Sequence, residues 1–348
     1  MRRFEGFEHG INLGGWLSQF DETTKTYYDT FITEADIEKI AAMGVDHVRL
    51  PVNYVMLETE SGEPKEDGYR YIDALLEWCG RAGLRTILDL HNTYGYSFDP
   101  LEEIEDREIF FRDGALQERF FALWERIAGR YGALSDRVAF ELLNEVLSPA
   151  ITEEWNAIAD QAVTRIRRLA PDSWILIGGV RCNHVSSVAL LWPPHDDRIV
   201  YNFHCYEPMV FTHQKAYWAD NIPKDRTVVY PDSSDAYVRM MREAGYPAEA
   251  AGVKEIRPCG SEINSDYFRT LFAPAVQAAE KNNAPLYCGE YGVIDRAPAD
   301  SALRWLKDIS AVFEEYGIAR ALWTYKKKDF GLVDEHYASV RDEMVKLL

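Results

Sequence analysis

Short apolar runs alternate with longer segments of helical periodicity along most of the chain. Within the apolar runs, apolar and polar positions do not alternate strictly. Strands that are buried on both faces of a parallel sheet have this pattern. We therefore predict strands at Ile11–Leu13, Val45–Leu50, Thr86–Leu90, Val138–Leu143, Trp174–Ile177, Ile199–His204, Leu286–Gly289 and Ala321–Tyr325.

The segments between these runs have helical spacing and recognisable ends. Thr33 is a suitable N-cap, and Gly44, Gly83 and Gly132 each follow a helical segment, where glycine favours termination. The alternation of eight strands with helices predicts an α/β protein, either a (β/α)8 barrel or a large doubly wound sheet. The predicted helices are Thr33–Met43, Tyr69–Arg81, Leu116–Tyr131, Thr152–Leu169, Tyr267–Asn282, Asp300–Tyr316 and Ala338–Leu348, with a short apolar run at Val185–Trp192.

The stretch from Cys205 to Asp266 breaks this rhythm, because it separates a strand from its following helix by far more residues than elsewhere. A loop of that length is usually functional or forms a small subdomain. A chain of 348 residues fits one barrel with insertions. We predict a single catalytic domain over residues 1–348, with residues 205–266 as an insertion at the barrel mouth.

Charge and cysteine content narrow the possible partners. The formal net charge of −19 disfavours nucleic acids and anionic membranes, since both bind basic surfaces. The five cysteines are scattered without a CxxC pair, unlike a disulfide framework. The first residues lack the apolar stretch of a signal peptide, and no segment has the length and apolar character of a membrane span. We expect a cytoplasmic monomer, or a secreted protein if a leader has been removed.

Polar and aromatic side chains gather where the predicted strands end. In a (β/α)8 barrel the active site lies at the C-terminal ends of the strands. Each of these residues alone has an ordinary structural explanation, but a cluster of buried polar groups at one barrel end is costly unless it serves a function. The residues are Arg49, His91, Asn144, Glu145, His204, Tyr206, Glu290 and Trp323.

Glu145 and Glu290 suggest glycoside hydrolysis. A glycosidic oxygen needs a protonated acid beside it, and the oxocarbenium-like transition state needs a carboxylate opposite. The two roles require different pKa values, and Arg49 beside one carboxylate would keep that carboxylate ionised. Nine Trp and twenty Tyr also provide flat faces on which sugar rings can stack, and Trp16, Tyr94, Trp218 and Trp323 lie near strand ends.

Other chemistries fit the sequence less well. There is no GxSxG or HExxH motif, and the run Gly10–Gly15 is neither a GxGxxG motif nor a phosphate-binding loop. A metal site is conceivable from His91, His204, Glu145 and Glu290, but the flanking Asn, Tyr and Trp side chains are typical of sugar binding. We therefore predict no metal and no other cofactor.

The ordered set of motifs resembles glycoside hydrolase family 5, whose members are retaining (β/α)8 enzymes. In this sequence the motifs are Gly10–Trp16, Val48–Pro51, Asp89–Asn92, Phe140–Glu145, His204–Tyr206, Gly289–Gly292 and Trp323. The resemblance implies that Glu145 is the acid/base and Glu290 the nucleophile. It assigns supporting roles to Arg49, His91, Asn144, His204 and Tyr206. The third motif often has two histidines in the family, whereas the second position here is Asn92.

Within the family, Tyr201–His204, Phe211–Ala216 and Trp323–Lys327 resemble clostridial endoglucanases of the C type. This resemblance implies an endo-β-1,4-glucanase that cleaves β-glucan, including mixed-linkage β-1,3-1,4-glucan and cello-oligosaccharides. A β-mannanase, a glucomannanase, a xyloglucan-cleaving enzyme, an exo-β-1,3-glucanase and an inactive carbohydrate-binding protein remain as alternatives. We expect substrate contacts from Trp323, Trp16, Asn92, Tyr94, His213 and Trp218.

Overall fold

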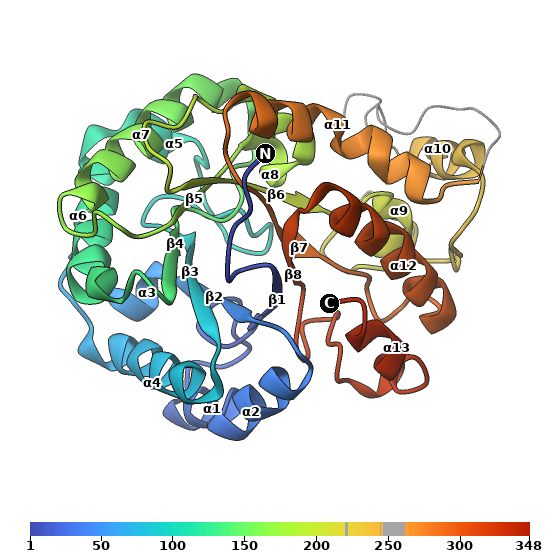
Figure 1. Cartoon of the computed structure of the whole chain (residues 1–348), viewed down its shortest axis with the longest axis horizontal. Helices are drawn as coiled ribbons and strands as arrows, with labels where there is room; N and C mark the ends of the chain where they lie inside the picture. The colour runs from blue at the N-terminus through green and yellow to red at the C-terminus, as the bar shows by residue number, and fades with distance from the viewer. Residues whose placement is uncertain (220–221, 244, 246–261) are drawn as a thin grey trace.

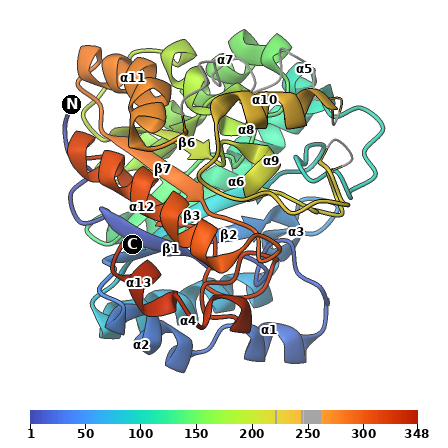
Figure 2. The same ribbon diagram turned by 90° about the vertical axis from the view of Figure 1, so that its right-hand side faces the viewer.

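The computed structural model describes residues 1–219, 222–243, 245 and 262–348. Its centre is a closed barrel of eight parallel strands, in which each strand pairs with the next and β8 pairs with β1. Helices surround the barrel (Figures 1 and 2), so the predicted (β/α)8 fold is confirmed. The strands are β1 (His9–Asn12), β2 (His47–Asn53), β3 (Arg85–Asn92), β4 (Val138–Glu141), β5 (Ile175–Gly178), β6 (Ile199–Cys205), β7 (Leu286–Tyr291) and β8 (Ala319–Leu322).

The long helices pack with their apolar sides on the barrel, and most begin or end at a capping residue. Asp113 accepts hydrogen bonds from the first backbone amides of α6, and Gly83 ends α4 in the left-handed conformation. The helices are α1 (Lys25–Phe31), α2 (Glu34–Ala42), α3 (Tyr54–Leu57), α4 (Glu66–Ala82), α5 (Ile109–Arg112), α6 (Gly114–Tyr131), α7 (Thr152–Arg167), α8 (Val180–Asn183), α9 (Met209–Thr212), α10 (Ser234–Glu243), α11 (Ser265–Lys281), α12 (Ala299–Tyr316) and α13 (Arg341–Val345).

Three predicted elements differ from the structure. The expected strand to Tyr325 ends at Leu322, because the Thr324 hydroxyl donates to the Asn12 carbonyl at 2.8 Å and accepts from the Gly14 amide at 3.0 Å, which interrupts the ladder. The run at Val185–Trp192 is a 3₁₀ helix, Val185–Leu190. The expected C-terminal helix is divided into a 3₁₀ turn at Glu335–Tyr337 and α13.

The long connection after β6 carries α9 and α10, which lie outside the ring of barrel helices near α11 and α12 (Figure 1). The hydroxyl of the buried Tyr230 donates to Asp308 of α12 at 2.7 Å, which attaches this segment to the barrel. Residues 220–221, 244 and 246–261 of the predicted insertion, including Cys259, lie outside the described residues.

The N-terminal segment closes one end of the barrel. Phe4 and Phe7 stack at 4.6 Å and join a buried cluster with Trp174 and Tyr287, and the segment crosses the near end of the barrel in Figure 1. A cleft is therefore restricted to the opposite end, where the strands terminate. Among the described residues, no helix has both the length and the apolar composition needed to span a membrane.

Candidate active site

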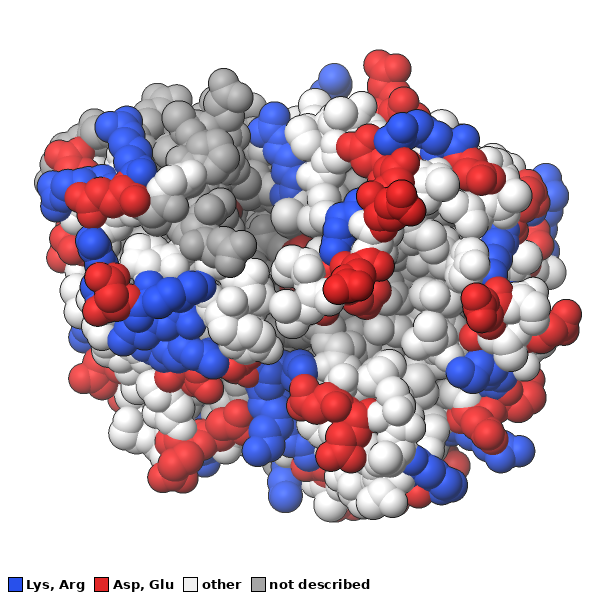
Figure 3. Space-filling model, turned by 180° about the vertical axis from the view of Figure 1, so that it is seen from behind, with Lys and Arg blue, Asp and Glu red and all other residues white. Residues whose placement is uncertain are grey.

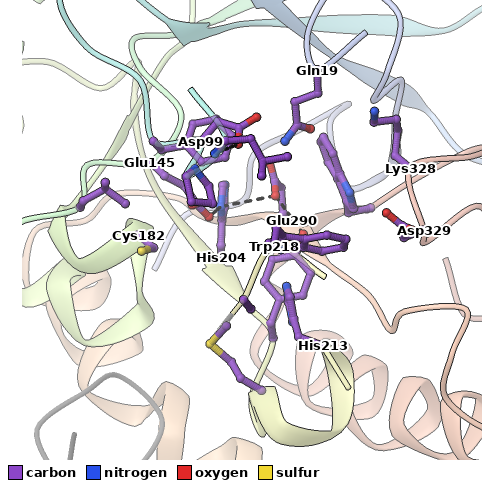
Figure 4. Close-up of a pocket in the computed structure, with 18 of the residues that line it drawn as sticks. Gln19, Asp99, Glu145, Cys182, His204, His213, Trp218, Glu290, Lys328 and Asp329 are labelled. Carbon is purple, nitrogen blue, oxygen red and sulfur yellow. Dashed lines mark hydrogen bonds and ion pairs between the residues drawn. The ribbon is translucent and has the colours of Figure 1, made fainter. Parts of the chain in front are cut away.

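A cleft with a volume of about 950 Å³ opens at the C-terminal ends of the strands. Figure 3 views the molecule from the side opposite to Figure 1, and this face is hollowed near its centre. Eight of the residues that the sequence predicts for the site line the cleft (Figure 4). They are His91, Glu145, His204, Tyr206, His213, Trp218, Glu290 and Trp323.

Arg49 lies beneath the cleft and is fully buried within β2. Its guanidinium donates to Glu290 Oε1 at 2.7 Å and to Asn144 Oδ1 at 2.8 Å. Arg49 also donates to Asn12 Oδ1 at 2.9 Å. The side-chain nitrogen of Asn12 in turn donates to the Gly289 carbonyl at 2.9 Å. Arg49 thus connects strands β1, β2, β4 and β7, and it fixes the position of one carboxylate oxygen of Glu290.

Two buried acids that the sequence analysis did not assign to the site complete this network. Glu141 accepts two bonds from Arg49, both at 2.7 Å, and Asp89 lies 3.0 Å from the same guanidinium. Burial raises the pKa of Glu141 to about 7 and the pKa of Asp89 to about 7, although Arg49 opposes both shifts. The sequence contained a sign of this network, because each acid lies within an apolar strand. An unpaired carboxylate is costly to bury there.

Asp89 also orients His91. The Nδ1 of His91 lies 2.6 Å from Asp89 Oδ2, and burial lowers the pKa of His91 to about 3. The neutral imidazole therefore donates its Nδ1 proton to Asp89, which leaves Nε2 as an acceptor. Within the described part of the chain, Nε2 has no hydrogen-bond partner. Because His91 lines the cleft, this nitrogen is suited to accept a hydrogen bond from a substrate hydroxyl.

Glu290 lies near the end of β7 and is held by two donors from different elements. Arg49 donates to Oε1, and the hydroxyl of Tyr206 donates to Oε2 at 2.9 Å. Burial raises the pKa of Glu290, whereas the charge of Arg49 and the bond from Tyr206 both lower it. Burial also raises the pKa of Tyr206 well above its usual value, so the phenol stays protonated and keeps donating. Glu290 is thus the better placed of the two acids to carry the negative charge.

Glu145 lies across the cleft from Glu290 (Figure 4). Among the described residues, no Lys or Arg forms an ion pair with it, and its charged-group neighbour is His204. Burial, together with the charge of Glu290, raises the pKa of Glu145 well above the usual value. Its Oε1 lies 2.8 Å from Nδ1 of His204, so the two side chains share one proton. Glu145 is therefore the group that stays protonated, as a general acid must.

Asn144 and Trp323 complete the surroundings of the carboxyl pair. Asn144 Oδ1 accepts a hydrogen bond from Arg49. Among the described residues, Asn144 Nδ2 has no hydrogen-bond partner. The Trp323 ring is parallel to the His91 ring, with an interplanar angle of 1° and centroids 5.8 Å apart. A Cβ at Gly14 would lie 2.8 Å from the Trp323 ring, so a glycine is needed there. This leaves a flat aromatic face with a free amide donor nearby.

Three of the expected substrate contacts are not in the cleft, and these predictions were wrong. Trp16 is fully buried, stacks on Trp78 and donates to the Tyr28 carbonyl at 2.8 Å. Asn92 is buried and accepts from the Tyr54 amide at 3.1 Å, so its oxygen organises the chain after β2. Tyr94 lies under the Arg119 guanidinium at 3.7 Å. Each lies at or after a strand end, but its side chain contacts neighbouring elements and does not line the cleft.

Ligand atoms of Glu145, His204 and Glu290 lie within 4.8 Å of one another, a spacing that a cation could bridge. No other group of this kind occurs in the described part of the chain. All three side chains, however, already take part in the hydrogen bonds that set their protonation. We therefore interpret the group as a proton-transfer site.

Comparison with known proteins identifies the family. The model of the cellulase family, glycosyl hydrolase family 5, matches residues 9–329. The chain belongs to this family. It is 43% identical to cellodextrinase A of Ruminococcus flavefaciens over 92% of this chain and 86% of that protein. It is 40% identical to endoglucanase C of Acetivibrio thermocellus over 98% of both chains.

Solved structures show the same fold at lower sequence identity. Cellulose synthase subunit Z from Clostridioides difficile superposes with a TM-score of 0.75, at 23% identity over 98% of this chain and 99% of that chain. Membership of glycosyl hydrolase family 5 makes the protein a glycoside hydrolase, and the predicted family is confirmed. The role of each site residue rests on the contacts described above.

Arg49→Lys should destabilise the protein and lower its activity. A lysine ammonium cannot bond Glu141, Asn144 and Glu290 together, so buried carboxylates lose their partner. We expect the free energy of unfolding to fall by about 3 kcal/mol, measured by urea denaturation. Arg168→Lys, at an exposed position after α7, is the control and should change the free energy of unfolding by less than about 0.5 kcal/mol. Equal stability of the two variants would contradict the structural role of Arg49.

Proposed function

We propose that the protein is an endo-β-1,4-glucanase that retains the anomeric configuration through double displacement. The observation that carries this proposal is the spacing of the acid pair, since carboxylate oxygens of Glu145 and Glu290 lie within 4.8 Å of one another. Retaining glycosidases have carboxyl groups about 5–5.5 Å apart, whereas inverting enzymes need about 6.5–9.5 Å to admit a water molecule.

Each step of this reaction has a residue suited to it. Glu290 attacks the anomeric carbon while Glu145 gives its proton to the departing glycosidic oxygen, which forms a glycosyl ester on Glu290. Glu145, now ionised, then takes a proton from water, and the resulting hydroxide displaces Glu290. Arg49 and Tyr206 stabilise the carboxylate of Glu290 whenever it leaves. Asn144 Nδ2 supplies a donor for the 2-hydroxyl of the sugar on Glu290.

The shape of the cleft favours cleavage within a chain. The cleft extends to both sides of the acid pair, with Cys182 on the side of Glu145 and with Lys328 and Asp329 on the other side (Figure 4). A polysaccharide can therefore occupy subsites on both sides of the scissile bond. The names of the two relatives, cellodextrinase A and endoglucanase C, support a substrate of β-1,4-linked glucose, either as short oligosaccharides or as a polymer. We include mixed-linkage β-1,3-1,4-glucan in this class.

The anomeric form of the first products tests the stereochemistry, and assays on polymers test the substrate. We expect ¹H NMR of the first minutes of cellotetraose hydrolysis to show β-configured reducing ends before mutarotation. Carboxymethyl cellulose and barley β-glucan should lose viscosity faster than they release reducing ends. Initial α-anomers would contradict double displacement. Activity on β-mannan or laminarin in preference to β-1,4-glucans would instead favour the mannanase or exo-β-1,3-glucanase alternative.

A further inference from the structure

The connection after β5 has an unusual backbone where it borders the cleft. Three consecutive residues of α8, Arg181, Cys182 and Asn183, have φ angles of 60°, 57° and 55°. Residues other than glycine rarely adopt this left-handed conformation, and a run of three is less favourable still. Arg181 and Cys182 both line the cleft. Backbone strain of this kind persists where surrounding contacts enforce it, and it is concentrated at functional sites.

The surrounding contacts hold this left-handed turn at both ends. The Cys182 amide donates to the Val146 carbonyl at 2.9 Å, next to Glu145 in the chain. Asn183 Oδ1 accepts from the Gly179 amide at 2.9 Å, and a Cβ at Gly179 would lie 2.2 Å from Ser187 Oγ, so the turn requires this glycine. After the turn, His184 Nε2 lies 3.1 Å from Glu207 Oε1. The position of Arg181 is therefore fixed by the fold.

The Arg181 side chain is half-buried in the cleft, and within the described part of the chain it has no hydrogen bond or ion pair. Its guanidinium thus presents several unused donors on the side of the cleft where Glu145 lies. The neighbouring cleft residues Leu147, Pro149 and Cys182 are apolar. Donors for hydroxyls beside an apolar surface are suited to a pyranose ring, which has polar edges and apolar faces.

The order of the strands fixes which part of the substrate meets this turn. Glu145 follows β4, and α8 follows the adjacent strand β5. Glu290 lies near the end of β7 and Trp323 follows β8, on the other side of the barrel. Glu145 must reach the glycosidic oxygen that leaves. The sugar bonded to that oxygen therefore extends past Glu145 toward α8, while the sugar attacked by Glu290 lies near Trp323.

We propose that Arg181, held by the left-handed turn of α8, binds hydroxyl groups of the leaving-group sugar and makes the enzyme select glucan chains that extend beyond the scissile bond. This inference rests on the proposed endoglucanase function. Arg181 thus determines specificity on the leaving-group side, whereas Glu145 and Glu290 carry out bond cleavage.

Two substrates with the same cellobiosyl unit but different leaving groups test this role. Cellotetraose releases cellobiose, which has hydroxyls for Arg181, whereas 4-nitrophenyl β-cellobioside releases a phenol without them. We expect Arg181→Ala to lower kcat/KM on both substrates unequally, with a loss on cellotetraose that is about tenfold larger than the loss on the aryl cellobioside. A difference of about tenfold corresponds to the loss of one hydrogen bond from a charged donor. Arg181→Gly should give the same selective loss without lowering Tm, since glycine accepts the φ of 60°.

Arg168→Ala is the matched control, because Arg168 is exposed after α7 and is not a cleft residue. It should leave both rate constants unchanged. The inference is wrong if both Arg181 variants lose kcat/KM equally on the two substrates, or lose it on neither. The proposed function stands in that case. If the parent protein hydrolyses neither substrate, the proposed function fails, and this inference fails with it.

Discussion

Glu290→Gln should lower kcat/KM on cello-oligosaccharides and on aryl cellobiosides by about four orders of magnitude or more. The amide neither attacks the anomeric carbon nor stabilises the positive charge that develops there. The side chain keeps its shape, its amide oxygen can still accept from Arg49, and its amide nitrogen can donate to the Tyr206 hydroxyl oxygen, so Tm should change little. Initial rates and thermal unfolding of the same preparations give both quantities.

The role of Glu290 can be separated from a general loss of activity. In Glu290→Gly, azide can enter the space of the carboxylate and attack the anomeric carbon from the same side, which would yield an α-glycosyl azide. Glu280→Gln, on the exposed side of α11, is the matched control and should retain parental rates. Near-parental turnover of Glu290→Gln, or a β-glycosyl azide from Glu290→Gly, would show that another group is the nucleophile.

Glu145→Ala should slow hydrolysis by about 10³-fold where the leaving group needs a proton, as with cello-oligosaccharides. The first step should be nearly unaffected for a 2,4-dinitrophenyl glycoside, because that phenolate leaves without protonation. The glycosyl-enzyme then accumulates, since the general base for water is missing. Azide should relieve this block and give a β-glycosyl azide. An equal loss with both leaving groups would contradict the acid/base role.

The pH profile provides a second measurement of Glu145. Burial and the charge of Glu290 raise the pKa of Glu145, and this acid must be protonated to act. Activity should therefore decline as the pH rises through the pKa of Glu145, and it should decline at low pH as Glu290 becomes protonated. In Glu145→Ala the alkaline decline should disappear for the dinitrophenyl substrate, while the acidic decline remains. A persistent alkaline decline would place the titrating acid elsewhere.

The sequence predicted the barrel because its signal is local and repeated. Eight short apolar runs, each followed by a helical segment, correspond to the eight strands, since burial on both faces requires apolar residues throughout. The errors lie where local pattern and tertiary contacts differ. Trp323 and Tyr325 continue an apolar run, but the side chain of Thr324 bonds the backbone of β1 and ends β8 at Leu322.

The site residues were predicted from their place at strand ends, and this rule does not say where a side chain points. The side chains of Glu145 and Glu290 do line the cleft, whereas Trp16 packs in the core. The rule also omitted Glu141 and Asp89, whose role depends on their sharing one guanidinium across β2, β3 and β4. Only the folded chain shows that contact.

The sequence by itself determined the barrel and the family and indicated the two candidate acids, because these depend on short motifs and on the periodicity of burial. The tertiary structure decided which acid is better suited to hold a proton, since Arg49 and Tyr206 both donate to Glu290, whereas no Lys or Arg of the described residues is paired with Glu145. It also decided that Arg181 faces the cleft, because a left-handed backbone is enforced by contacts from elsewhere in the chain.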